Sequence, residues 1–247
     1  MKLALFADIH SNLEALTACL AQAKALGAQR YAFLGDLVGY GADPVAVLDL
    51  IERHAAEGAV VVLGNHDAAV LGRPVSGLTP GAQAAIDWTR RQIGERQRAF
   101  LAGLPLSARE EDLFFVHASA AAPERWSYIT SEHQAAQSMR AANAHFVFCG
   151  HVHEQRLYYM GAAAKPMPFR PVTGTPIPTA RHRQWLAIVG SAGQPRDRNP
   201  AACWALADLE RARLTFFRAA YDHAAAAEKV RAAGLPERLA WRLERAL

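Results

Sequence analysis

Two histidines separated by one residue, His151 and His153, follow a short apolar run that ends at Cys149. On extended backbone, alternate side chains point to the same side, and Gly150 gives the chain freedom to turn out of a sheet. Two imidazoles directed at one point suit metal binding, because neutral imidazole is a common metal ligand. Such a pair also arises by chance, so its interpretation depends on the rest of the chain.

Similar short polar motifs, called polar corners below, occur at four other points of the chain. Each directly follows an apolar segment of strand length. In chain order they are Asp8-x-His10, Gly35-Asp36, Gly64-Asn65-His66-Asp67 and His117. Each motif alone is weak evidence, but five in this order indicate one shared site. Carboxylate, imidazole and amide oxygen without thiolate suit Mn, Fe, Zn, Co or Ni better than Ca. The number of candidate ligands favours two divalent ions, with manganese preferred; the candidates are Asp8, His10, Asp36, Asn65, His117, His151 and His153.

Strand, loop and helix alternate in the first third of the chain. Strands are predicted over 3–7, 31–34 and 59–63, with helices from the Asn12 cap to Gly27 and over 44–54. This order predicts parallel strands joined by right-handed crossovers, with the loops gathered at the carboxyl edge of the sheet. The polar corners lie in these loops, so they are expected to meet.

The later chain changes character. Helices are predicted from 80, over 95–101 and over 131–142, with a hairpin of 106–109 and 113–116 and a strand over 145–149. Short strands over 156–160, 185–189, 203–208 and 214–219 are separated by prolines, and local hairpins there predict an antiparallel second sheet packed on the first. Ala-rich helices over 224–233 and 237–246 end the chain. No repeat or linker is evident, so 1–247 is expected to form a single domain.

Composition narrows the classes of partner. Hydrophobic residues make up 51% and charged residues 20% of the 247 residues, as in globular proteins. The net charge of +4 is diffuse, so nucleic acid is not the expected partner, and no apolar run is long enough for a membrane span. Three separated cysteines and the absence of a signal-like N-terminal segment favour a cytoplasmic location. Homo-oligomerisation stays open.

Taken together, the motifs resemble the calcineurin-like metallophosphoesterase superfamily. The similarity runs from Asp8 to His153 and more weakly to Asp208. The segments 8–16, 35–41 and 190–196 look like its small prokaryotic phosphodiesterase branch, which includes diadenosine tetraphosphate hydrolases. The resemblance implies an α/β fold, a four-layer α/β/β/α sandwich of two mixed sheets flanked by helices, with the site between the loop ends of the sheets.

The resemblance also implies roles for individual residues. The first ion would be held by Asp8, His10, Asp36 and His153, and the second by Asp36, Asn65, His117 and His151. His66 matches the catalytic histidine, which stabilises the transition state or protonates the leaving oxygen. Asp67 either orients His66 through its other ring nitrogen or caps a helix. Gln194 and Arg196 lie on a loop that the resemblance places near the site, and are expected to bind substrate.

The implied function is a dinuclear-metal-dependent phosphoesterase, foremost a phosphodiesterase or dinucleoside polyphosphate hydrolase that uses a metal-bridging hydroxide as nucleophile. One alternative is a nuclease on the same metals, which needs a basic groove and hydrolysis that falls steeply with salt. Another is a non-catalytic metal-binding or scaffold module, but no ligand is missing. Four further residues have two interpretations each: Arg181 and Arg183 clamp phosphate or lie in a solvated loop, and Tyr40 and Trp126 stack on a base or pack in the core.

Overall fold

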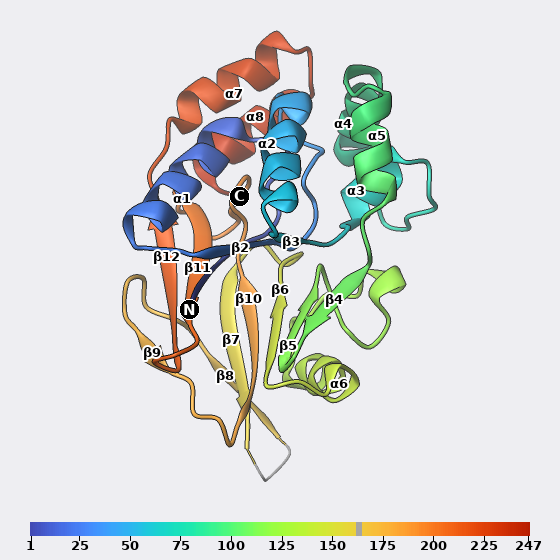
Figure 1. The fold of residues 1–247 in the computed structure, drawn as a ribbon. Coiled ribbons are helices and arrows are strands. Elements are labelled where there is room, and N and C mark those ends of the chain that lie inside the picture. Colours follow the sequence, from blue (N-terminus) through green and yellow to red (C-terminus); the bar gives the residue numbers. More distant parts are fainter. Residues whose placement is uncertain (162–164) are drawn as a thin grey trace.

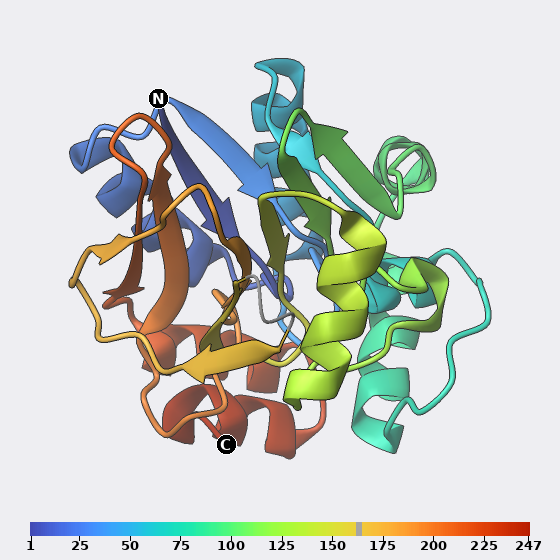
Figure 2. The same ribbon diagram turned by 90° about the horizontal axis from the view of Figure 1, so that it is seen from below.

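The computed structural model describes residues 1–161 and 165–247. Two six-stranded mixed sheets pack face to face, with helices on the outer side of each (Figure 1). The strand order is β3-β2-β1-β11-β12-β9 in the first sheet and β4-β5-β6-β10-β7-β8 in the second. Helices α1 and α2 cover the first sheet, and α6 covers the second (Figure 2). The predicted four-layer α/β/β/α sandwich is confirmed.

The first sheet combines strands from both ends of the chain. Its strands are β1 (Lys2–Phe6), β2 (Arg30–Phe33), β3 (Val60–Val61), β9 (Ile177–Pro178), β11 (Ala202–Asp208) and β12 (Arg213–Ala219). As predicted, β1, β2 and β3 are parallel and are connected through α1 (Leu13–Ala25) and α2 (Pro44–Ala56). Strand β11 runs antiparallel to β1 and pairs with β12 on its other side.

The second sheet comes from the middle of the chain. Its strands are β4 (Ser107–Glu110), β5 (Leu113–Val116), β6 (Phe146–Cys149), β7 (Gln155–Met160), β8 (Pro166–Phe169) and β10 (Gln184–Val189). The prediction that the late strands form a separate antiparallel sheet is wrong, because β11 and β12 join the first sheet and β10 lies parallel to β6. Local turn signals do not specify which sheet a strand enters.

Besides α1 and α2, the described residues form seven short or medium-length helices, of which α6 covers the second sheet. They are α3 (Asn65–Val70), α4 (Pro80–Gln92), α5 (Glu95–Ala102), the short 3₁₀ helix η1 (Pro123–Arg125), α6 (Glu132–Ala142), α7 (His223–Ala232) and α8 (Glu237–Arg245). Helix α3 replaces what the sequence predicted as a loop. None of the helices in the described part of the chain has the length and apolar character needed to cross a bilayer.

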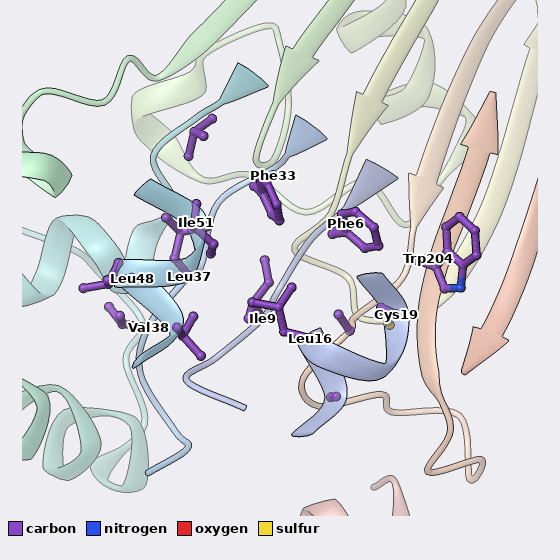
Figure 3. Close-up of a cluster of buried hydrophobic side chains, with 14 of the residues drawn as sticks. Phe6, Ile9, Leu16, Cys19, Phe33, Leu37, Val38, Leu48, Ile51 and Trp204 are labelled. Carbon is purple, nitrogen blue, oxygen red and sulfur yellow. The ribbon is translucent and has the colours of Figure 1, made fainter. Parts of the chain in front are cut away.

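Aromatic side chains fix the strand ends from which the polar loops project. Phe6 of β1 stacks on Phe33 of β2 and on Trp204 of β11, with ring centroids 5.5 and 5.8 Å apart (Figure 3). On the other face of the sheet, Phe115 and Phe148 are fully buried between the two sheets. Each buried ring stabilises the fold by roughly 1.5–3 kcal/mol. The ends of β1, β2 and β6 are therefore held firmly in place.

Gly150 lies where the end of β6 passes the end of β1. A Cβ at this position would be 2.4 Å from the Ala7 Cβ and 2.6 Å from Asp8 Oδ2. We therefore expect Gly150→Ala to lower the free energy of unfolding by about 1–3 kcal/mol, as overpacking does, measured by urea denaturation. Gly81→Ala is the matched control, because nothing lies within 4 Å of its added Cβ. Equal stabilities of the two variants would contradict this close approach.

Candidate functional site

The polar corners predicted from the sequence converge at one end of the sandwich. Asp8 and His10 follow β1, Asp36 follows β2, and Asn65 begins α3. From the second sheet, His117 follows β5, while His151 and His153 follow β6. All seven side chains are buried, with exposed fractions between 0 and 7%. The cluster therefore draws its members from both sheets.

The potential ligand atoms gather in three overlapping groups, and the ligand atoms of each group lie within 4.8 Å of one another. Asp8, His10 and His153 form the first, Asp36, His117 and His151 form the second, and His10, Asp36 and His66 form a third that shares a member with each of the other two. Asp36 Oδ2 lies 3.7 Å from His10 Nε2 and 3.4 Å from His117 Nε2, so this oxygen faces histidines of the first and the second group. The Oδ1 of Asn65 lies 3.1 Å from His117 Nε2, beside the second group.

Main-chain carbonyl groups fix the orientation of three of the imidazole rings. Nδ1 faces a carbonyl oxygen at 3.2 Å in His10, 2.8 Å in His117 and 2.6 Å in His153; the acceptors belong to Val38, Leu34 and Gln194. Each ring thus directs Nε2 into the cluster, as metal-binding histidines do. Burial lowers the pKa of both His10 and His153. Their two neutral Nε2 atoms nevertheless lie 3.1 Å apart, an arrangement that a cation between the lone pairs would stabilise.

Protons balance the charge of the cluster when no metal is bound. Burial raises the pKa of Asp8 to about 7, although the nearby His117 opposes this shift. Burial alone would lower the pKa of His117, but Asp36 and then Asp8 outweigh it and raise that pKa to about 9. Burial opposes ionisation of Asp36 too, yet His117 and His66 hold its pKa well below the usual range. A cationic His117 thus occupies the position where a metal would supply positive charge.

Left-handed backbone distinguishes the ligand positions from ordinary strand residues. The angle φ is +67° at His151 and +65° at His153, so the extended backbone that we inferred for this pair is wrong. As a consequence, the two side chains point to different groups: His151 Nδ1 lies 3.1 Å from His117, and His153 Nε2 lies 3.1 Å from His10. Positive φ also occurs at three further ligand candidates, Asp8, His10 and Asp36. Such residues are uncommon and gather at functional sites.

Comparison with known proteins agrees with this geometry. Residues 1–212 match the family model of the calcineurin-like phosphoesterase superfamily domain. The chain belongs to the calcineurin-like phosphoesterase superfamily. An uncharacterized protein of Methanocaldococcus jannaschii is 31% identical over 251 residues, which cover 98% of this chain and 96% of that protein.

Two solved structures share the fold along the whole chain. A metallophosphoesterase from Sphaerobacter thermophilus is 33% identical, with a TM-score of 0.88 and coverage of 100% of this chain and 99% of that one. A hypothetical protein from Pyrococcus horikoshii is 20% identical, with a TM-score of 0.78 and coverage of 100% and 98%. The chain thus combines the four-layer fold with a His/Asp cluster that could bind divalent metal.

A cavity of about 290 Å³ lies over the cluster and is lined there by Asn65, His66 and His151. Its other lining residues include Tyr40, Val75, Ser76, Gly77, Leu78, Thr79, Ala82, Arg125, Trp126, Tyr128, Arg196 and Arg242. Cavities of about 490 and 650 Å³ elsewhere on the molecule contain none of the seven ligand candidates. Of these three cavities, the one of about 290 Å³ is the one that borders the ligand cluster.

The two expected substrate-binding residues occupy different places. Arg196 lines the cavity, whereas Gln194 lies behind His153, with its carbonyl oxygen facing the His153 Nδ1. Arg181 and Arg183 precede β10, at the opposite end of that strand from the loop that carries Gln194, so they do not clamp phosphate at this site.

Aromatic residues line the cavity as well. Tyr40 and Trp126, which had two interpretations each, both contribute to its wall. The Tyr40 ring also contacts the rings of His10 and His66, each with centroids 4.5 Å apart. Sequence reasoning missed Tyr128, whose ring stacks on His151 at 4.0 Å, and it missed Arg242. Neither residue lies in a loop directly after a strand, so the signal that found the ligands could not find them.

Asp67 caps α3 instead of contacting the His66 ring. Its carboxylate accepts backbone N–H bonds from Gly64 at 2.9 Å, Leu37 at 2.9 Å and Val38 at 3.1 Å. The His66 Nδ1 is buried and has no hydrogen-bond partner in the described part of the structure. Asp67 thus holds α3 against the loop after β2, and the hydrogen bond expected to orient His66 is not formed.

Removal of the Asp67 carboxylate would leave three buried N–H groups without acceptors. We expect Asp67→Ala to lower the free energy of unfolding by about 2–4 kcal/mol, since each unsatisfied group is costly. Asp222→Ala is the control, because among the described residues this exposed cap accepts one bond, from Ala225, and its loss should cost about 1 kcal/mol. If urea denaturation gave similar losses for both variants, the role of Asp67 in holding α3 would be contradicted.

Proposed function

We propose that the protein is a phosphoesterase that uses two divalent metal ions, with manganese preferred, to hydrolyse small phosphodiesters or phosphoanhydrides. The observation that carries this proposal is that two of the buried ligand groups, the one with Asp8 and the one with Asp36 and His117, share no member, while Asp36 Oδ2 faces histidines of both. Two ions held there would activate water and stabilise charge on the phosphoryl oxygens. The cavity also includes Arg242 of α8, beyond the residues that match the family model. We therefore propose that the whole chain acts as one domain.

His66 is the residue that we assign to the leaving group. It is 4% exposed, lines the cavity and lies against His10, with ring centroids 4.8 Å apart. Burial lowers the pKa of His66, although Asp36 opposes the shift, so the ring is neutral near pH 7. A neutral imidazole can donate one N–H bond. Because the Nδ1 of His66 is buried, we assign this donor to Nε2. Its N–H would donate to the leaving oxygen and stabilise it as the phosphorus–oxygen bond breaks.

Two other residues position the reacting groups. The carbonyl oxygen of Gln194 orients the His153 ring. The Arg196 guanidinium lies over the Tyr40 ring, 5.9 Å from its centroid, and lines the cavity. Guanidinium groups match phosphate oxygens in geometry and charge. Arg196 is therefore positioned to bind a phosphate oxygen of a substrate in the cavity.

Metal analysis tests the proposed centre directly. We expect the parent protein to bind about two manganese ions per chain, measured by mass spectrometry after gel filtration. His153→Ala and His151→Ala should each retain about one, because each removes a ligand from a different group. His133→Ala, on the exposed face of α6, should bind as the parent does. A parent protein that binds no transition ion would refute the proposal.

His66 can be tested separately from metal binding. We expect His66→Gln to lower kcat on bis(p-nitrophenyl) phosphate by roughly 10²–10⁴-fold, the usual contribution of a positioned acid or base. The metal content should stay at the parent value, because His66 is not one of the assigned ligands. Assays with Mn, Co, Ni and Mg, before and after chelation, provide the baseline. A rate equal to that of the parent would remove His66 from the mechanism.

A further inference from the structure

Two arginines in the cavity, Arg196 and Arg242, form no direct ion pair with a carboxylate in the described part of the chain, although the charge of Arg196 acts at longer range on Asp8. Both side chains are partly buried, and the Arg196 Nε is fully buried without a hydrogen-bond partner. The partners of Arg196 are neutral: Gln194 Oε1 at 3.3 Å and the ring of Tyr40. Across residues 1–161 and 165–247, no carboxylate forms an ion pair with either arginine.

Several other partly buried arginines of this chain pair with carboxylates, although Arg98 and Arg183 do not do so among the described residues. Arg30 pairs with Glu110 at 2.8 Å, Arg156 with Glu154 at 2.8 Å, and Arg231 with Glu244 at 2.8 Å. Removing a charge from water without a counter-charge is costly. The two cavity arginines form no such ion pair within the described residues, and an anion that enters the cavity from outside the chain would supply the missing negative charge.

The two charges also oppose each other. Burial lowers the pKa of Arg242, and the positive charge of Arg196 lowers it further. Tyr40 interacts electrostatically with both arginines. An anion bound by both guanidinium groups would relieve this repulsion and form charge-assisted hydrogen bonds with them.

Helix α8 holds Arg242 in place. Its Leu239 and Leu243 are buried in an apolar cluster with Tyr40 and with Ala82 of α4. Arg242 directly precedes Leu243 and lines the cavity together with Asn65 and His66. Because α8 lies outside residues 1–212, which match the family model, membership in the superfamily does not imply this arginine.

We propose that Arg196 and Arg242 form a second phosphate subsite beside the ligand cluster, so that the substrate is a phosphoanhydride that carries a second phosphate next to the one that is hydrolysed. The identity of the hydrolysed phosphate rests on the proposed function. Binding of an anion by the two arginines does not, because neither arginine belongs to the ligand cluster.

Pyrophosphate binding to the metal-free protein tests the subsite without catalysis, and it avoids chelation of metal by the probe. By titration calorimetry, we expect Arg242→Ala to weaken pyrophosphate binding about 10- to 100-fold, with Arg242→Lys between this variant and the parent. Arg238→Ala is the matched control, because Arg238 is exposed one turn earlier on α8 and its loss should change binding by less than about threefold. A parent that does not bind pyrophosphate, or an Arg242→Ala variant that binds it unchanged, would overturn the subsite.

Substrate preference of the metal-loaded protein gives a second readout. The ratio of kcat/KM for diadenosine tetraphosphate to kcat/KM for bis(p-nitrophenyl) phosphate should fall about tenfold in Arg242→Ala and stay constant in Arg238→Ala. An equal loss on both substrates would place Arg242 at the hydrolysed phosphate and overturn the second subsite. If the parent hydrolysed neither substrate with any metal, the proposed function would fail, and pyrophosphate binding alone would decide the subsite.

Discussion

Asp8 joins the two sheets at the point where their strands end. Its carboxylate accepts the backbone N–H of His151 at 2.9 and 3.1 Å, which ties the loop after β6 to the end of β1. Its carbonyl oxygen accepts bonds from Gly193 N–H and the Ser191 hydroxyl, and its own N–H donates to Gly35. One residue therefore fixes the loops after β2, β6 and β10. The ligand cluster depends on this junction, because its members come from both sheets.

The ligand cluster and the adjacent cavity differ in the charged side chains that they contain. Buried carboxylates and a cationic His117 balance one another where metals would bind. The cavity beside them has arginines from two other segments, the loop after β10 and helix α8, and within the described residues neither arginine forms an ion pair with a carboxylate. The strand ends of the two sheets thus supply the polar cluster, whereas segments outside the sheets supply the positive charges of the cavity.

The ligand candidates could be predicted from the sequence because each follows its own apolar run, a local signal. The pairing of strands that lie far apart in the sequence could not be predicted from local patterns. Strand β11 pairs with β1, so that Lys2 lies opposite Asp208. The local sequence of β11 does not indicate whether it joins the first sheet or the second. Asp67 illustrates a third limit: a carboxylate next to a histidine has several possible donors, and the folded loop decides that Leu37 and Val38 are among them. The position of Arg242 in the cavity could not be predicted for the same reason, because Arg242 comes close to the ligand cluster only when α8 packs against the rest of the fold.

The spacing of His151 and His153 shows how backbone conformation, rather than sequence alone, sets the use of a motif. On an extended strand both rings would face the same side. With φ near +65° at both positions, one ring faces His117 and the other faces His10. The left-handed conformation is unfavourable for most residues, and the surrounding junction must hold it. The stacked core of Phe6, Phe33 and Trp204 holds the end of β1, and β1 holds His151 through Asp8. The separation of these two ligands into different groups is thus a product of the core packing several residues away.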